Sequence, residues 1–248
     1  IVYVDHNQRG REIWFDGQWR HHPLPAAPLP ASEVAISKTG DRLHVTYRTR
    51  FGNPCELTLN SSPLEAKRIW APRLIKRVPS RGRPLAFNPG ERRYVIFRAA
   101  EKWPVRQPFL FHHIVRDLKV DRPPNALLRS SDVGDSFWRL EQIGGPANQV
   151  AGDPCVIHDA ERKFYFLAYR NTAGHIQEVA VTGGAWPVTD LTELSAAPVA
   201  AGEPAGFVSA TGKSRYYVYR GRDGHLHELH FDGTWTHRDL SAAAAAVP

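Results

Sequence analysis

The chain of 248 residues has the composition of an ordinary soluble globular protein, with 42% hydrophobic residues, 23% charged residues and a net charge of +7. No apolar run approaches the roughly 18 residues that a membrane-spanning helix needs. The length exceeds that of a typical single domain, but all-β sandwiches, barrels and propellers reach it as one unit. These bulk properties exclude a helical membrane protein and leave one large all-β domain open.

The positive charge is concentrated in residues 67–106, which hold twelve Lys and Arg against two Glu. The rest of the chain is slightly acidic. Such a basic region predicts an anionic ligand such as phosphate, sulfate or an anionic polysaccharide. A solvated, arginine-rich edge would have the same composition, and both interpretations stay open here.

The chain begins in the strand-like run IVYV and contains no methionine, so we expect its natural start to lie upstream. Its two cysteines, Cys55 and Cys155, lack the spacing of a metal site. The repeat described next places them in non-adjacent units, too far apart for a disulfide, so both are expected to be buried free thiols. Cysteine usage leaves the cellular compartment open, secretion included.

A repeat of about 50 residues organises the chain, and such periods are typical of stacked or radial repeat folds. Five tryptophans mark it, each followed five residues later by an aliphatic residue. The pairs are Trp19 with Leu24, Trp70 with Ile75, Trp138 with Ile143, Trp186 with Leu191, and Trp235 with Leu240. The units are residues 1–30, 31–81, 82–150, 151–200 and 201–248.

Each unit is predicted to contain four short strands. In chain order, the first strands are VAIS, LAF, CVI and GFVSA, and the more apolar second strands are IVYV, LHVTYR, RYVIFR, FYFLAYR and YYVYR. Turns with Ala173-Gly174 or Asp223-Gly224 lead to third strands such as HIQEVAV and HLHELHF, and the tryptophan lies on the fourth. No segment shows a sustained helical period.

Four-stranded units at this period predict an all-β fold, a β-propeller of antiparallel blades that forms a single domain over residues 1–248. Five units are visible, and the first lacks its opening strand. The third unit is longer than the others because of a turn-rich segment at residues 115–136, which we expect to be a loop. A parent with six or seven blades is compatible with the repeat.

Arginine and glutamate recur at one spacing in three of the five units, whereas tryptophan recurs in all five. Unit one keeps Glu12 without the arginine, and unit three keeps Arg98 without the glutamate. A pair that varies between units is the better candidate for a binding site. The candidate sugar-binding residues are Arg48, Glu56, Arg170, Glu178, Trp186, Arg220, Glu228 and Trp235.

The chemistry of these residues suits a sugar. Arginine donates to hydroxyl groups, a carboxylate accepts from them, and an indole covers the apolar C–H face. A structural interpretation stands beside this one. With two-residue turns, Tyr169 would lie opposite Glu178, and Tyr219 opposite Glu228, so that the adjacent arginines form diagonal ion pairs within each blade.

The segments YRNTAGHIQEVAVTGGAWPVTDL and YRGRDGHLHELHFDGTWTHRDL resemble blades of the fungal fucose-specific and bacterial Photorhabdus-type propeller lectins. The resemblance is clear over residues 151–248. It implies multivalent binding of fucose-like glycans between blades, without catalysis or a cofactor. In the fungal pattern an arginine lies about twelve residues before the glutamate. This chain has Phe166 and Tyr216 there, so the fungal site is not conserved intact.

Other functions remain open. A five-bladed glycoside hydrolase would use carboxylates around its centre, with Asp153 as a candidate, although Glu203 occupies the same place in the next unit. A propeller that binds protein within a larger protein, and an oligomer, are further alternatives. His225 and His227 share one strand face, but HELH is not a zinc motif and no metal is expected there.

Overall fold

A computed structural model describes residues 2–7, 9–15, 17–24, 34–39, 42–60, 69–75, 80–88, 94–100, 127–132, 138–143, 149–159, 164–181 and 186–245. Within these ranges the chain forms five separate antiparallel sheets in which strands neighbour one another in chain order. In the part of the chain that is described, no helix combines the length and the apolar character needed to cross a membrane.

The first sheet contains three strands, β1 (Val2–Val4), β2 (Gly10–Phe15) and β3 (Trp19–Pro23), as expected for a unit that lacks its opening strand. Each of the next four sheets contains four strands. The second sheet contains β4 (Ala35–Thr39), β5 (Arg42–Arg48), β6 (Pro54–Asn60) and β7 (Ile69–Leu74), and the third contains β8 (Ser80–Phe87), β9 (Tyr94–Ala99), β10 (Leu127–Asp132) and β11 (Trp138–Ile143). The fourth sheet contains β12 (Cys155–Asp159), β13 (Phe164–Arg170), β14 (Ile176–Val181) and β15 (Val188–Asp190). The fifth contains β16 (Ala205–Val208), β17 (Arg215–Arg220), β18 (Leu226–Phe231) and β19 (Trp235–Asp239).

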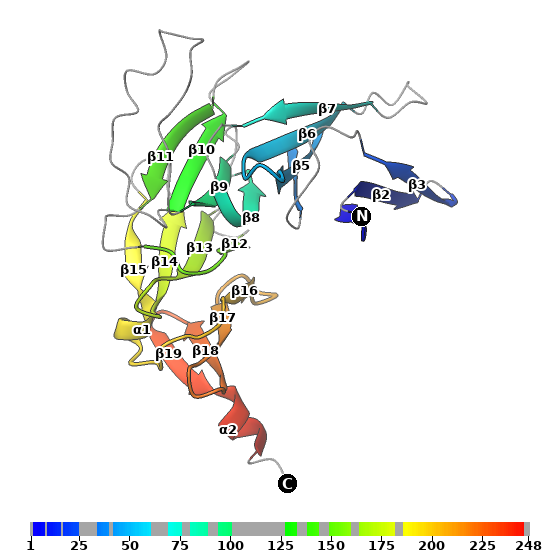
Figure 1. Cartoon of the computed structure of the whole chain (residues 1–248). Coiled ribbons are helices and arrows are strands. Elements are labelled where there is room, and N and C mark those ends of the chain that lie inside the picture. Colours follow the sequence, from blue (N-terminus) through cyan, green and yellow to red (C-terminus); the bar gives the residue numbers. More distant parts are fainter. Residues whose placement is uncertain are drawn as a thin grey trace, which may run out of the picture.

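The sheets follow one another along an arc, with β1–β3 at one end and β16–β19 at the other (Figure 1). The first strands of neighbouring blades contact one another, β4 with β8, β8 with β12 and β12 with β16, and β5 also contacts β8. This is the radial order of propeller blades, and it confirms the predicted fold class. We number the sheets as blades 1 to 5 in chain order.

Two expectations about local structure were wrong. Residues 127–132, predicted as loop, form β10, which pairs with both β9 and β11. Their sequence, LLRSSD, has no clean alternation, so only the pairing reveals the strand. Two short helices, α1 (Leu191–Leu194) and α2 (Leu240–Ala245), also follow the fourth strands of blades 4 and 5. A helix of one turn is too short to produce a helical period in the sequence.

The two helices begin in the same way. The Asp190 carboxylate accepts the backbone N–H of Glu193, and the Asp239 carboxylate accepts that of Ala242, each at three residues' distance along the chain. A side chain that accepts from the third residue is the usual N-cap of a helix. The aliphatic residue that follows each cap, Leu191 or Leu240, is the one that the repeat places after the tryptophan.

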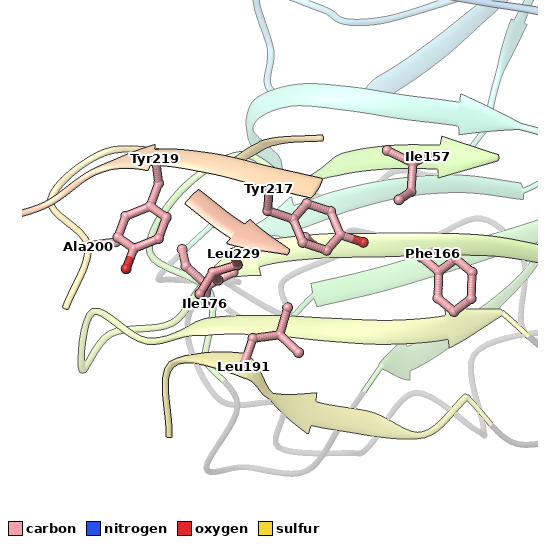
Figure 2. Packing of buried hydrophobic residues seen from close by; sticks show 9 residues of the cluster. Ile157, Phe166, Ile176, Leu191, Ala200, Tyr217, Tyr219 and Leu229 are labelled. Atoms are coloured by element: carbon pink, nitrogen blue, oxygen red, sulfur yellow. The ribbon is translucent and has the colours of Figure 1, made fainter. Parts of the chain in front are cut away.

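The core of this fold lies between the sheets. Each strand points alternate side chains to opposite faces, so every inner blade packs against two neighbours. At the junction of blades 4 and 5, Ile157 and Ile176 from blade 4 meet Tyr217 and Leu229 from blade 5, and all four are buried. Figure 2 shows this cluster, in which Tyr217 points across the junction toward β13, the strand of Phe166.

Both cysteines lie within the described residues. Cys55 is buried and Cys155 half-buried, both as free thiols, and burial raises the pKa of Cys155 to about 12.

Most of the basic residues between 67 and 106 lie outside the described residues or have undescribed side chains. Residues 115–126 and 133–136 of the long segment in unit three also lie outside the described ranges. The anionic ligand therefore stays a prediction.

Close packing at the junction makes one glycine indispensable. A Cβ added to Gly206 on β16 would approach the Tyr217 ring and the Ile157 Cγ2 atom to 2.8 Å. We expect Gly206→Ala to lower the free energy of unfolding by about 1–3 kcal/mol through overpacking. Urea denaturation measures the change. Ala205→Val, on the exposed opposite face of the same strand, is the matched control and should leave stability nearly unchanged; equal losses in both variants would contradict this packing.

Candidate functional site

The best-formed polar cluster of the described chain lies between blades 4 and 5. Glu178 projects from β14 toward blade 5 and is only 5% exposed. Arg215, the first residue of β17, donates from Nε to Glu178 Oε2 at 3.0 Å and from Nη2 to Oε1 at 3.1 Å. The Tyr217 hydroxyl donates to Oε2 at 2.8 Å. Both carboxylate oxygens are therefore occupied by donors from the next blade.

Aromatic rings surround the guanidinium of Arg215. Its Cζ atom lies 4.0 Å from the centroid of Phe166 on blade 4, 4.0 Å from that of Phe231 on blade 5, and 5.2 Å from the Trp235 ring. Such contacts attract a cation through the ring quadrupole. Burial, followed by the nearby Glu178 charge, raises the pKa of Tyr217, so its hydroxyl remains a donor at neutral pH.

The strand register differs from the expected one. Glu178 lies opposite Ala168, not Tyr169, and Glu228 lies opposite Val218, not Tyr219. The expectation assumed two-residue turns, whereas Asn171 and His175 close a loop of three residues with Gly174 at φ +94°. A left-handed glycine in that place is typical of three-residue hairpin loops.

In this register, Arg170 shares the face of Glu178 but lies opposite Ile176, two pairs further along the hairpin. Its Nη2 atom lies 3.4 Å from the carbonyl oxygen of Ala151. The structure thus gives Arg170 a backbone partner and gives Glu178 an arginine from another blade.

Blade 2 keeps its arginine and glutamate apart in a similar way. Arg48 donates from Nε to the carbonyl of Gly82 in blade 3 at 3.3 Å. Glu56 is 1% exposed and accepts from the hydroxyl of Thr58 at 3.3 Å, with the His44 ring nitrogen at 3.7 Å. Each side chain has its own local partners.

The two tryptophans of the candidate set face the preceding blade. Trp186 contacts Tyr94 at 5.0 Å and Phe87 at 6.4 Å between ring centroids, both on blade 3. Trp235 lies beside Arg215 and Tyr217 at the junction with blade 4. Glu178 is therefore grouped with Trp235 of the next blade, and not with Trp186 of its own.

The second carboxylate lies on the face of blade 5 that points away from blade 4. Glu228 is half-buried, and within the described ranges its side chain has no hydrogen bond or ion pair. Beside it the Tyr216 ring stacks on Phe207 at 4.8 Å and on His230 at 4.5 Å. Arg220 is exposed on the same face, and Arg238 lies directly opposite Glu228 on β19. A carboxylate, two arginines and stacked rings thus share one face of blade 5.

Asp153, the candidate carboxylate for a hydrolase, connects blades at their inner ends. It accepts the backbone N–H of Arg83 from blade 3 at 2.8 Å and has the Arg98 guanidinium at 3.9 Å. Desolvation raises its pKa. One unit later, Glu203 accepts the backbone N–H of Asp153 at 3.0 Å. The repeated carboxylate thus links successive blades through a hydrogen bond to the backbone of the earlier blade.

The histidines of blade 5 pair with carboxylates. The Nδ1 atom of His225 lies 2.8 Å from the Asp239 carboxylate, and blade 4 repeats this pair with His175 and Asp190 at 2.7 Å. The buried His227 places Nε2 at 3.0 Å from Asp223 and Nδ1 at 3.0 Å from His237 Nε2. Among the residues with described side chains, no three His, Cys, Asp or Glu are arranged to hold a metal ion.

Arg215 is the residue that the repeat analysis missed. It immediately precedes Tyr216, the position at which the fungal pattern has its arginine. A shift of one residue along a strand moves a side chain to the opposite face. Arg215 therefore reaches the glutamate of the preceding blade instead of Glu228 on its own. The sequence signal that could have identified this residue was an arginine one position before the one at which the fungal pattern has its arginine.

Comparisons with solved structures identify the class of fold. The chain is similar to AofleA from Arthrobotrys oligospora, with 10% identity and a TM-score of 0.60, covering 94% of this chain and 64% of that one. It is also similar to the six-bladed fucose-recognising lectin of Aleuria aurantia, with 15% identity, a TM-score of 0.58 and coverage of 100% and 75%. SapL1 lectin, solved with α-methyl fucoside, matches at 12% identity and a TM-score of 0.53, covering 96% and 74%.

No protein-family model and no curated protein matches the sequence. At these identities the likeness shows the fold alone: the chain has the β-propeller fold found in these lectins, and the resemblance inferred from its repeats is confirmed at that level. The chain spans about two thirds of the length of AofleA.

The two glutamates should respond differently to removal. Glu178→Ala leaves the buried guanidinium of Arg215 without its carboxylate, and we expect a loss of about 3–5 kcal/mol in unfolding free energy. Glu228→Ala removes a carboxylate without protein partners in the described chain and should cost less than about 1 kcal/mol. Chemical denaturation of both variants measures the difference. Comparable losses would mean that Glu228 is also held by the protein.

The histidines of blade 5 should titrate on either side of their ordinary pKa of 6.5. The hydrogen bond that Asp239 accepts raises the pKa of His225, whereas desolvation and the nearby His227 lower that of His237. The His225 pair therefore favours the folded state below pH 6.5 and loses this effect as the pH rises through its folded pKa. The His237 contribution is present above pH 6.5 and is lost as the pH falls toward its folded pKa. NMR titration of the two rings tests this order, and a reversed order would contradict the assigned pairs.

Proposed function

We propose that this protein is a lectin, a non-catalytic glycan-binding protein with several sites on its blade faces. The observation that carries the proposal is that Glu228, Tyr216 and two arginines lie together on one face of a propeller blade. The propeller fold shared with fungal lectins supports the same conclusion.

The chemistry of this face suits a sugar. The Glu228 carboxylate can accept from sugar hydroxyl groups, while Arg220 and Arg238 can donate to them. Charge-assisted hydrogen bonds of this type are stronger than neutral ones. The stacked rings of Phe207, Tyr216 and His230 offer apolar surface to the C–H face of a sugar ring.

Fucose is the first sugar to test. The Aleuria aurantia lectin recognises fucose, and SapL1 was solved with α-methyl fucoside. In this chain Phe166 and Tyr216 replace the arginine of the fungal pattern, so a galactose-like or O-methylated sugar is an equal candidate. The sugar itself is part of the proposal.

Multivalency follows from the repeat. A monosaccharide buries little surface, so a single site is weak, but linked sites on one rigid body raise the effective concentration at a glycan-covered surface. We propose that the whole of residues 1–248 forms one such domain, and that residues 67–106 add an attraction for anionic glycans.

The residues predicted from the repeat contribute unequally to this proposal. Arg220 and Glu228 share one face of blade 5 with stacked rings, and they are our first choice of ligand contacts. Arg48, Glu56, Arg170, Glu178, Trp186 and Trp235 are engaged within or between blades in the present structure. A hydrolase is disfavoured because Asp153 and Glu203 both accept backbone N–H groups at blade junctions.

A glycan array followed by calorimetry tests the proposal. We expect micromolar to millimolar binding of α-methyl fucoside, galactose or their O-methyl derivatives, and a loss of about tenfold or more in affinity for Glu228→Ala, the range of one lost charged hydrogen bond. Glu193→Ala, which changes an exposed residue of helix α1, is the control and should bind normally. No binding across the array would reject a lectin, and release of reducing sugar from a polysaccharide would indicate an enzyme instead.

A further inference from the structure

The junction of blades 4 and 5 has a chemistry of its own. We infer that it is a guanidinium-binding box which the chain fills with Arg215, so that this junction is closed to glycans. The box consists of the Glu178 carboxylate, the Tyr217 hydroxyl and the rings of Phe166 and Phe231. That the junction is closed to glycans matters for function only if the proposed lectin activity holds. The presence of a guanidinium-binding box does not depend on that proposal.

The hydrogen bonds match a planar, forked cation. Two different nitrogens of Arg215 donate to the two different oxygens of Glu178, at 3.0 and 3.1 Å. This bidentate geometry is available to a guanidinium and not to the ammonium of lysine, which is a compact point charge. The carboxylate thus selects the shape of its partner as well as its charge.

The rings add to this selection. One ring from each blade, Phe166 and Phe231, lies 4.0 Å from Cζ of Arg215. A flat, weakly hydrated guanidinium stacks on aromatic faces more readily than an ammonium does. Arg215 is 7% exposed, so these contacts are made away from solvent, where electrostatic attraction is stronger.

A sugar finds no free acceptor in this box. Both oxygens of Glu178 accept from Arg215, and one of them also accepts from Tyr217. A glycan would have to displace a buried, bidentate ion pair. The box therefore differs from the face of blade 5, where Glu228 has no such partner in the described chain.

Blades 2 and 4 lack the arginine that fills this box. Its arginine lies five residues before Arg220, and the residues five before Arg48 and Arg170 are Leu43 and Tyr165. Neither can form a bidentate ion pair with a carboxylate. The Arg93 position of blade 3 lies outside the described residues. At this position of the repeat the arginine is therefore present in blades 3 and 5 and absent from blades 2 and 4.

Replacement of the internal guanidinium by a free one tests the box. Arg215→Ala removes the side chain but leaves Glu178, Tyr217 and the rings in place. We expect a lower thermal midpoint, which methylguanidinium at about ten times its dissociation constant should raise again by about 3–5 °C. Methylammonium at the same concentration should have little effect, and methylguanidinium should not raise the midpoint of the unaltered protein.

Two further variants guard against ambiguity. Arg215→Lys keeps the charge without the fork, and it should be less stable than the unaltered protein without any rescue, because its own side chain fills the box. Glu178→Ala combined with Arg215→Ala removes the ion pair and should not respond to methylguanidinium. If Arg215→Ala fails to fold, its refolding yield with methylguanidinium against methylammonium gives the same comparison.

The outcomes separate this inference from the proposed function. Equal stabilisation by methylguanidinium and methylammonium, none by either, or a larger effect of α-methyl fucoside on Arg215→Ala would overturn the guanidinium box. Glycan binding by the unaltered protein is measured separately, so a protein that binds no sugar but shows the rescue would reject the lectin and retain the box.

Discussion

Alternation along a strand governs every junction in this structure. A blade that packs on both faces must place successive side chains toward two different neighbours. On β17, Arg215 and Tyr217 point to blade 4, whereas Tyr216 and Val218 point outward. Neighbouring positions in the sequence therefore belong to different interfaces. The ion pair of Glu178 with Arg215 is the clearest result, because its two members come from separate units of the repeat.

This geometry also explains which features the sequence could predict. The repeat of tryptophans, the apolar second strands and the turns depend on local patterns, and they led to the propeller without a structure. The partner of Glu178 depends on the packing of one blade against the next. Arg170 lies at a constant distance in the sequence and was the natural choice, but it contacts the Ala151 carbonyl. The loop of residues 172–174, one residue longer than assumed, shifted the predicted register as well.

The structure divides the repeated polar residues into two groups. One group holds the fold together: Glu178 with Arg215, Asp153 with the Arg83 backbone, and the capping aspartates with their histidines. The other group, with Glu228, Arg220 and Arg238, shares the face of blade 5 that points away from blade 4. Recurrence alone does not separate them, because Glu178 and Glu228 hold equivalent places in their blades. Their surroundings do, and a buried carboxylate with three donors has little capacity left for a ligand.

The hydrogen bonds that Asp153 and Glu203 accept from the preceding blade have the same direction along the chain. At the two junctions that have it, the carboxylate comes from the later blade and the backbone N–H from the earlier one, as Asp153 to Arg83 and Glu203 to Asp153 show. A backbone donor is present whatever the side chain, so the earlier blade needs no particular residue there. Duplication within the gene of a blade that carries this carboxylate would thus create a junction that already has the hydrogen bond between carboxylate and backbone. This tolerance provides a simple route by which propellers of this kind can change in size while each new junction evolves its own contents.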